Sequence, residues 1–298
     1  MSLIWGIPYL FIKIAVDAGV PPLLVAFSRV ALGALVLVPI AWRTGALRGI
    51  RGRLGWVVTF ALFEIAIPFP LISYGEVHVS SSVTAILIAS LPLVVAGVTL
   101  RIDPEDAISG ARLAGLLLGL AGVMLLVGVD IAGSSQELLG ALCVLGATLG
   151  YAVGPMIIRR RLSDLDPRGV SAVALLVGTA MLSPALVLTP LHETPAAKAV
   201  VAIAVLGIVC SALAFVVFFA LIVEAGPTRA TVVTYLNPAV AVLLGVLVLG
   251  ETLGAASIAG LVLILAGSWT ATGGGVYTPS RARSRRRTSG HSEARIEK

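Results

Sequence analysis

Charged residues are scarce in this sequence. Asp, Glu, Lys and Arg make up 12% of its 298 residues, against about 25% in ordinary soluble domains. Hydrophobic residues make up 58% of the chain, and its mean hydropathy is +1.05. This composition excludes an ordinary soluble domain.

Residues that commonly carry covalent or metal chemistry are equally scarce. The two cysteines, Cys143 and Cys210, lie in separate apolar runs, which excludes a disulfide framework and a Cys/His zinc spacing. His78 and His192 fall in predicted outer loops, and His291 falls near the C-terminus. The chain has no HExxH, GxSxG or intramembrane Asp pair, and no phosphate-binding Gly-rich loop after a strand. We therefore expect no enzyme activity, no metal and no cofactor.

Uncharged apolar runs of about 20 residues, in contrast, recur along nearly the whole chain, as expected of membrane-spanning helices. A helix satisfies all its backbone hydrogen bonds within its own segment, and the runs are too continuous for the alternating strands of a barrel. The sequence predicts an all-α polytopic membrane protein with ten transmembrane helices. The predicted spans are 2–16, 23–42, 54–73, 82–100, 111–129, 138–158, 170–189, 199–223, 230–249 and 255–272.

The distribution of Lys and Arg among the predicted loops gives the orientation, because cytoplasmic loops are enriched in these residues. Loops after even-numbered spans hold eleven arginines, whereas loops after odd-numbered spans hold only Lys198. This asymmetry predicts that both termini are cytoplasmic, in the cell (inner) membrane.

The two halves of the chain share a pattern. The stretch from Ala85 to Gly122 resembles the stretch from Thr231 to Gly267, and Pro92 matches Pro238 at an offset of 146 residues. The same offset aligns Trp5 with Tyr151, Lys13 with Arg159 and Pro21 with Pro167. Five spans per repeat is an odd number, so the second copy enters the membrane inverted. We expect a first repeat at 1–132, a second, inverted repeat at 133–272, and the alternating-access architecture of many secondary transporters.

Residues 273–298 lose the apolar pattern and predict a disordered cytoplasmic tail. The tail holds seven Lys/Arg and two Glu, so it supplies +5 of the net charge of +6. The basicity is therefore no sign of a nucleic-acid partner. The tail could contact anionic lipid at about 1 kcal/mol per basic residue, or it could simply fix the topology.

Two charged residues lie deep within predicted spans. Glu64 is placed near mid-bilayer, where a charge costs about 2.5–3.5 kcal/mol on insertion scales. It is the candidate for a coupling (protonation) site or a substrate contact, with a purely structural ion pair or hydrogen-bonded Glu as the alternative. Arg29 reaches a similar depth and could pair with Glu64 or snorkel to the interface. Lys13, nearer a span end, is interpreted as a snorkelling anchor.

Polar and aromatic positions within the spans complete the predicted substrate cavity. Pro92 and Pro238 predict helix breaks, which free backbone carbonyls and mark binding sites in transporters, although simple kinks are the alternative. The predicted cavity comprises Trp5, Arg29, Glu64, Ser90, Tyr151 and Asn237.

Acidic residues in the predicted turns and glycines in spans 5 and 10 have structural interpretations. Glu251 and the acidic residues of the turn 103–106 are expected to cap the helix that follows each of them. The glycines are Gly115, Gly119, Gly122, Gly260 and Gly267, and they permit close helix approach. They favour packing faces or a homodimer through spans 5 and 10.

Taken together, these residues resemble the EamA-like family of the drug/metabolite transporter superfamily. The resemblance covers about residues 2–272 and rests on Trp5-Gly6, Lys13, Arg29, Pro92, Pro238, Gly250-Glu251, Gly260 and Gly267. It implies ten helices in two inverted repeats, a cavity lined by the first four spans of each half, and peripheral spans 5 and 10. It also implies movement of amino acids, metabolites or drugs, often outward and by proton or substrate antiport.

The sequence departs from that pattern at two places. Pro104-Glu105-Asp106 replaces the usual Gly-Glu after span 4. Few residues precede span 1, so we expect either a short first helix or a translation start upstream of Met1.

The sequence therefore predicts a secondary transporter of small organic solutes that works by alternating access at a midplane cavity, with export favoured by the resemblance. A non-transporting membrane scaffold is the main alternative. An intramembrane enzyme is the other, although the motifs it needs are absent.

Overall fold

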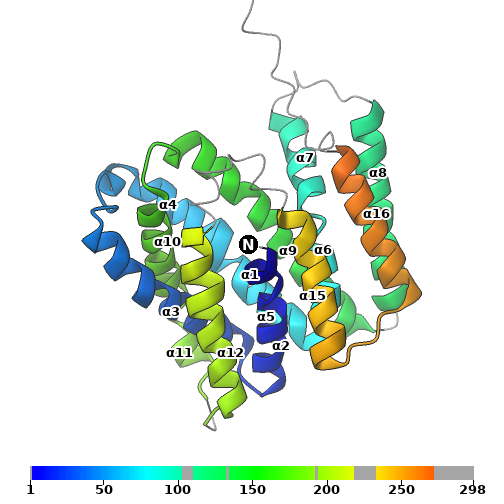
Figure 1. Ribbon diagram of the computed structural model, residues 1–298, viewed down its shortest axis with the longest axis horizontal. Helices are drawn as coiled ribbons and strands as arrows, with labels where there is room; N and C mark the ends of the chain where they lie inside the picture. The colour runs from blue at the N-terminus through cyan, green and yellow to red at the C-terminus, as the bar shows by residue number, and fades with distance from the viewer. Residues whose placement is uncertain (1, 103–109, 132–133, 192–193, 218–232, 272–298) are drawn as a thin grey trace, which may run out of the picture.

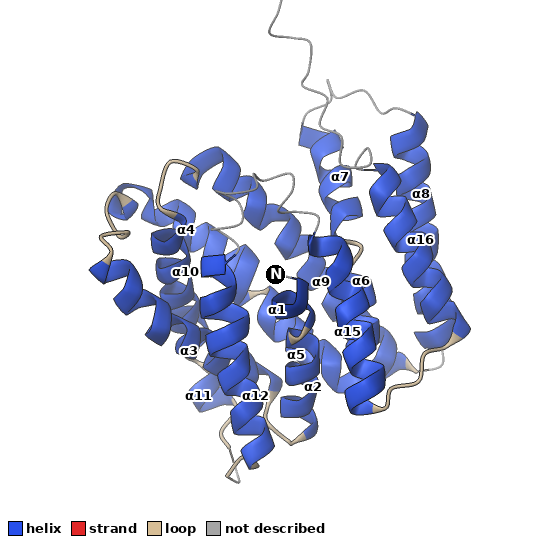
Figure 2. Ribbon diagram, viewed as in Figure 1, coloured by secondary structure: helices blue, strands red, loops and turns tan. Residues whose placement is uncertain are grey.

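The computed structural model describes residues 2–102, 110–131, 134–191, 194–217 and 233–271. These ranges form helices joined by short connections and contain no strand (Figure 2). The basic segment 273–298 and the acidic turn 103–106 lie outside the described residues, so the expectations for them remain predictions.

Helices occupy each predicted span of the first half. They are α1 (Ser2–Gly6), α2 (Pro8–Asp17), α3 (Pro22–Arg43), η1 (Ile50–Arg53), α4 (Leu54–Ala61), η2 (Leu62–Ala66), α5 (Pro68–His78), α6 (Ser81–Ile88), α7 (Leu91–Ile102), α8 (Gly110–Leu125) and η3 (Leu126–Ile131). Span 3 is longer than expected, because α5 continues five residues past the predicted end at Ser73.

Helices also occupy the described parts of the predicted spans of the second half. Residues 218–223 of span 8 and 230–232 of span 9 lie outside the described residues. They are α9 (Ser135–Ile157), η4 (Ile158–Leu162), α10 (Pro167–Leu182), α11 (Ala185–Leu188), α12 (Ala197–Gly207), η5 (Ile208–Leu213), α15 (Val233–Leu249) and α16 (Ala255–Ala271). The elements η2, η3, η4 and η5 are π-helical turns, and η1 is a 3-10 turn.

Within the described ranges, five helical stretches are long and apolar enough to cross a membrane. They are Pro22–Arg43, Ile50–His78, Ser135–Gly154, Pro167–Leu188 and Ala197–Val217. Their outward faces remain apolar: Leu35 is 71% exposed and Leu149 is 59% exposed. Apolar residues facing outward on helices of this length contact lipid tails without penalty, so the chain is a multi-pass membrane protein.

Glycines join α8 and α16 into a pair at one edge of the bundle (Figure 1). A Cβ atom on Gly122 would lie 2.9 Å from the carbonyl oxygen of Gly260, and one on Gly260 would lie 3.0 Å from the carbonyl oxygen of Gly122. The small residues therefore bring the two backbones of one chain together. A homodimer through these helices remains a prediction, and it would use their opposite, leucine-rich faces.

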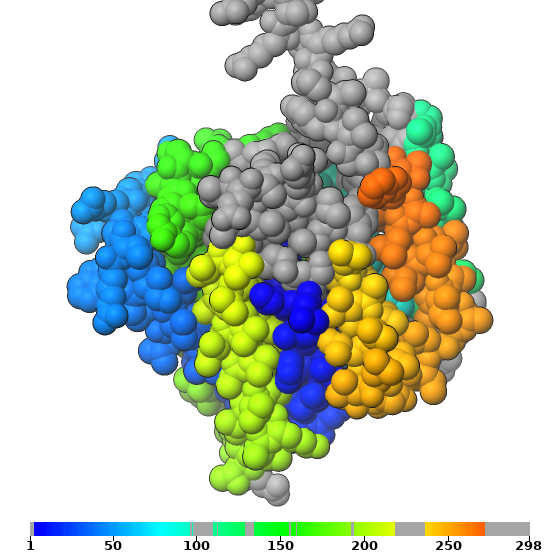
Figure 3. Space-filling model, viewed as in Figure 1, coloured from blue at the N-terminus to red at the C-terminus, as the bar shows by residue number. Residues whose placement is uncertain are grey.

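One face of the molecule presents α12, the α1–α2 segment and α15 side by side (Figure 3). The segment α2 contacts α12, α5 and α15, so it lies between elements of both halves. This position explains why an apolar stretch so near the start of the chain has fully buried residues, such as Ala15, on one side.

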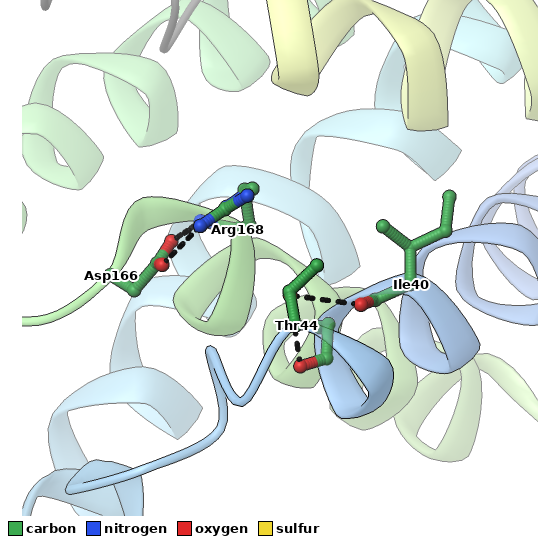
Figure 4. A network of polar contacts seen from close by, with 5 residues as sticks. Ile40, Thr44, Asp166 and Arg168 are labelled. Carbon is green, nitrogen blue, oxygen red and sulfur yellow. Dashed lines mark hydrogen bonds and ion pairs between the residues drawn. The ribbon is translucent and has the colours of Figure 1, made fainter.

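The end of α3 and the start of α10 meet at one end of the bundle (Figure 4). The Thr44 hydroxyl donates to the carbonyl oxygen of Ile40 at 2.9 Å and so satisfies a terminal acceptor of α3. Asp166 caps α10 by accepting from the backbone N–H of Arg168 at 2.9 Å, and it also pairs with the Arg168 guanidinium. The guanidinium hydrogen bond is the main cause that holds the pKa of Asp166 below its usual range.

Candidate functional site

Arg29 lies at the centre of a buried polar cluster. It projects from α3, is 8% exposed, and donates from Nε to the Ser211 hydroxyl at 3.1 Å. Its guanidinium lies 4.1 Å from the centroid of the Phe69 ring, a cation–π arrangement that offsets part of the cost of burying the charge. Ser211 belongs to the second half of the chain, so this contact links the two halves.

The predicted pair between Arg29 and Glu64 is wrong for this conformation. Glu64 Oε2 is buried and has no hydrogen-bond partner among the described residues, and the described contacts of Arg29 go to Ser211 and Phe69. Depth along the span, from which the pair was predicted, does not give the side of the helix on which each residue lies. Snorkelling of Arg29 to the interface is wrong as well, because its side chain is buried within the bundle.

Glu64 sits in the middle of the π-turn η2 and faces α9. The space for its carboxyl group exists because residue 154 is glycine: a Cβ there would overlap Oε2 of Glu64 and lie 3.4 Å from the Phe60 ring. π-turns occur often at functional sites. The corresponding turn in the second half, η5, begins at Ile208, which is 146 residues after Leu62 (208 − 62).

Two tyrosines connect the charged groups of the cluster. Tyr151, on α9, interacts electrostatically with Arg29, Tyr9 and Glu64. Tyr9, on α2, interacts in the same way with Glu76 and Arg29. The structure therefore gathers Arg29, Glu64 and Tyr151 of the predicted cavity, and it adds Tyr9 and Glu76, which the sequence analysis did not select.

Lys13 makes two polar contacts near the end of α2, and its role as a snorkelling anchor stays a prediction. Its ammonium donates to the backbone carbonyl of Glu76 at 2.9 Å and pairs with Asp17, one helical turn away, at 3.1 Å. The side chain of Glu76 is fully buried. Sequence reasoning missed this carboxylate because it follows the apparent end of span 3, and the only signal was the unbroken helical run from Pro68 through Gly75.

The remaining predicted cavity residues lie at the α6–α7 and α1–α15 contacts. Ser90 is buried between α6 and α7, and its hydroxyl donates to the carbonyl oxygen of Leu87 at 2.6 Å. Trp5 lies on α1 and Asn237 on α15, and these two helices meet where Gly6 approaches the carbonyl oxygen of Asn237.

The two prolines behave differently. Pro92 stands in the first turn of α7, just after the break between α6 and α7, as expected for a residue that lacks a backbone N–H. The helix α15, however, runs through Pro238, so the predicted break is absent there. A single missing hydrogen bond is tolerated in a helix that packs against α1, α2 and α6.

Glu251 caps a helix, but not the one that follows it. Its carboxylate accepts from the backbone N–H and the hydroxyl of Ser81, both at 2.8 Å, and from the backbone N–H of Ser82 at 3.0 Å and the Ser82 hydroxyl. These donors begin α6, in the other half of the chain. We name this contact the Glu251 clamp. Gly245 makes room for it, because a Cβ there would overlap both Oε2 of Glu251 and the Ser82 hydroxyl.

This arrangement places charged and polar side chains inside the bundle, and its described part shows no cluster of metal ligands. Within the described ranges, no three His, Cys, Asp or Glu side chains gather as a metal site requires. A shallow pocket of about 300 Å³ beside the Glu251 clamp is lined by His78, Val79, Ser80, Val83, Glu137, Thr252, Gly254 and Ser257. None of the predicted cavity residues lines it.

The fold and the buried charges define a helical membrane protein with a polar centre. The sequence profile of the EamA-like transporter family matches residues 1–128 and 138–273. The chain therefore belongs to this family, which gives it a general transporter role.

Curated relatives agree with this assignment. The chain is 26% identical to protein PagO of Salmonella typhimurium, over 81% of this chain and 80% of that protein. It is 25% identical to the uncharacterized transporter YoaV of Bacillus subtilis, over 90% and 92%. It is 27% identical to the uncharacterized inner membrane transporter YedA of Escherichia coli K12, over 85% and 82%. A crystal structure that is 22% identical, covering 91% of this chain and 96% of its own, has the same fold with a TM-score of 0.61.

Proposed function

We propose that this chain is a secondary transporter of small organic solutes, such as amino acids, metabolites or drugs, and that it works as an exporter. It operates by alternating access between two inverted five-helix halves, residues 1–132 and 133–272. The contact that carries the proposal is the buried hydrogen bond of 3.1 Å between Arg29 and Ser211. It connects the two halves at a polar centre, where a carrier of this architecture binds its substrate.

The spacing of the π-turns supports the duplication. Both η2 and η5 interrupt the third helix of their half, at equivalent positions 146 residues apart. The π-turn is thus repeated, but the side chains at equivalent positions differ. Glu64 in the first turn aligns with Cys210 in the second turn at the offset of 146 residues (64 + 146). A symmetric scaffold with an asymmetric polar lining suits a carrier that opens alternately to each side and still selects its solute.

The cavity is lined by Trp5, Arg29, Glu64, Ser90, Tyr151 and Asn237, with Glu64 as the coupling group. The assignment of Glu64 as the coupling group is supported by its Oε2 atom, which is buried and has no hydrogen-bond partner among the described residues. A carboxyl group without a donor in hydrocarbon gains most by holding a proton or meeting a cation. Arg29 provides the positive group for an acidic part of the solute, and Tyr151 interacts electrostatically with both Arg29 and Glu64.

The orientation follows from the loop charges, with both termini cytoplasmic. The name of the relative YedA supports an inner (cell) membrane location. In this orientation the Glu251 clamp lies on the outer side, and we infer that it closes the carrier to the outside.

The test is uptake into proteoliposomes of pooled labelled amino acids and small metabolites, with and without an imposed pH gradient. Accumulation that follows the gradient and disappears in Glu64→Gln supports a proton-coupled carrier. Glu137→Gln, the same change at the start of α9, serves as the matched control and should transport normally. Movement that depends only on solute on the opposite side indicates an exchanger. No movement of any solute contradicts the proposal and favours a scaffold.

A further inference from the structure

A second carboxyl group, separate from the one at Glu64, is buried in the first half. Glu76 lies near the end of α5, and its side chain is 0% exposed. Neither of its carboxyl oxygens has a hydrogen-bond partner among the described residues. Twelve residues separate it from Glu64, which corresponds to about 18 Å along a helix. The two groups therefore belong to different sites.

The nearest cation is already engaged elsewhere. The Lys13 ammonium bonds to the backbone carbonyl of Glu76 at 2.9 Å and to the carboxylate of Asp17 at 3.1 Å. It thus contacts the backbone of Glu76 and yet forms no hydrogen bond with the Glu76 carboxyl group. Lysine is suited to such an exchange, because its flexible stem carries a compact charge with three rotatable donors.

The charges around Glu76 balance without it. Among the described residues, the charged groups that act on it through space are Lys13, Glu251, Arg29 and Asp17. These are two cations and two anions, and both anions have strong partners: Asp17 has Lys13, and Glu251 has the start of α6. An ionised Glu76 would add an unpaired negative charge to a dry cluster, which is costly. A neutral Glu76 keeps the cluster balanced.

In the described part of the chain, no helix packed around α5 donates a hydrogen bond to this carboxyl group. The helix α3 contributes Arg29, which donates to Ser211 instead. The segment α2 contributes Tyr9 beside Lys13, and α6 has no ionisable side chain. At this level α9 presents Gly140 and Val144 to Gly75, and its titratable groups are Glu137, Cys143 and Tyr151. On α5 itself, the rings of Tyr74 and His78 pack edge to face, 5.0 Å apart.

We propose that Glu76 is a proton-binding site of the carrier. It holds its proton in the described conformation and releases it to water when Lys13 leaves Asp17 and pairs with the Glu76 carboxylate. The ammonium remains charged throughout, so the step exchanges one ion pair for another and frees one proton. Its role in coupling rests on the proposed transport function, whereas the proton itself can be detected without any solute.

The first test is infrared difference spectroscopy of the reconstituted full chain at neutral pH. The carbonyl stretch of protonated carboxyl groups should be weaker in Glu76→Gln than in the wild type, because the contribution of Glu76 is missing, while Glu137→Gln keeps the full band. The difference spectrum is the spectrum of the wild type minus that of Glu76→Gln. If this difference spectrum lacks the band, Glu76 is ionised and the proposal is overturned.

The second variant leaves Glu76 untouched. Asp17 is half exposed, so Asp17→Asn should fold normally and release Lys13 to pair with Glu76. We expect the same weakening of the infrared band in this variant, whereas a band of full strength would overturn the Lys13 exchange. This arm decides the question even if Glu76→Gln does not fold.

Transport separates the two proposals. If the wild type moves no solute in proteoliposomes, the proposed function fails, while the infrared band still decides whether Glu76 holds a proton. If the wild type follows a pH gradient, Glu76→Gln should lose that dependence. Gradient-driven accumulation that is unchanged in Glu76→Gln would overturn the coupling role.

Discussion

The Glu251 clamp predicts a large stability effect from a single residue in a loop. Replacing Glu251 with Ala removes the acceptor for two backbone N–H groups and two hydroxyls at the start of α6. Ser81 and Ser82 are fully buried, so water cannot replace the carboxylate. The hydroxyls can turn to other acceptors, but the two N–H groups of a first helical turn cannot.

Each buried N–H left without an acceptor costs about 1–3 kcal/mol, which gives about 3 kcal/mol for the pair. At about 2 °C per kcal/mol for a chain of this size, Glu251→Ala should lower the thermal midpoint by about 6 °C. Glu251→Gln should cost about half as much, because its amide oxygen still accepts while its NH₂ group faces a donor. The assay is thermal unfolding of purified protein in one detergent, followed by tryptophan fluorescence.

Thr252→Ala is the matched control, since Thr252 is the next residue and is exposed. Its thermal midpoint should equal that of the wild type. If Glu251→Ala has the same thermal midpoint as the wild type, the contact contributes nothing to stability, and the reasoning from two buried N–H groups left without an acceptor is refuted.

Two further predictions concern packing and acid stability. Gly267→Leu should lower the thermal midpoint, because a Cβ at Gly267 overlaps the backbone of Gly119. The overpacking should cost about 3 kcal/mol or more. Gly110→Leu, where the added Cβ meets no atom within 4 Å, should leave the thermal midpoint unchanged. The lowered pKa of Asp166 means that its contribution to stability is present at neutral pH and is lost below about pH 4, as the carboxyl group protonates. Asp166→Asn should therefore reduce the acid dependence of the thermal midpoint, and an identical profile in the two proteins would contradict this.

Hydropathy placed the helices well because the bilayer imposes both a length and a composition on each span. Predicted span 2 covered residues 23–42, and α3 runs Pro22–Arg43; predicted span 10 covered residues 255–272, and α16 runs Ala255–Ala271. The same reasoning ended span 3 too early, since a Glu after Ser73 interrupts the apolar run. Glu76 remains within the helix because α2 and α9 pack against α5 there, and no local pattern in the sequence predicts such packing.

Contacts between distant segments could not be predicted in the same way. Depth along a span does not give the direction of a side chain around the helix, which is why the expected Arg29–Glu64 pair was wrong. The partners of Glu251 are 170 and 169 residues away, and an acid in a turn favours the nearest helix start by default. The sequence did indicate two charged residues within apolar spans, Arg29 and Glu64, that the structure buries, and their role in transport stays a prediction.

The position of the Glu64 carboxyl group depends on the absence of one methyl group across the interface with α9. Gly154→Ala would place a Cβ against Oε2 of Glu64 and displace the carboxyl group without changing its chemistry. If Glu64 couples transport to protons, Gly154→Ala should lose pH-gradient-driven uptake as Glu64→Gln does, whereas Gly55→Ala, with no atom within 4 Å of the added Cβ, should transport normally. Unchanged coupling in Gly154→Ala would mean that the placement of this carboxyl group is unimportant, and coupling would then have to be sought at Glu76.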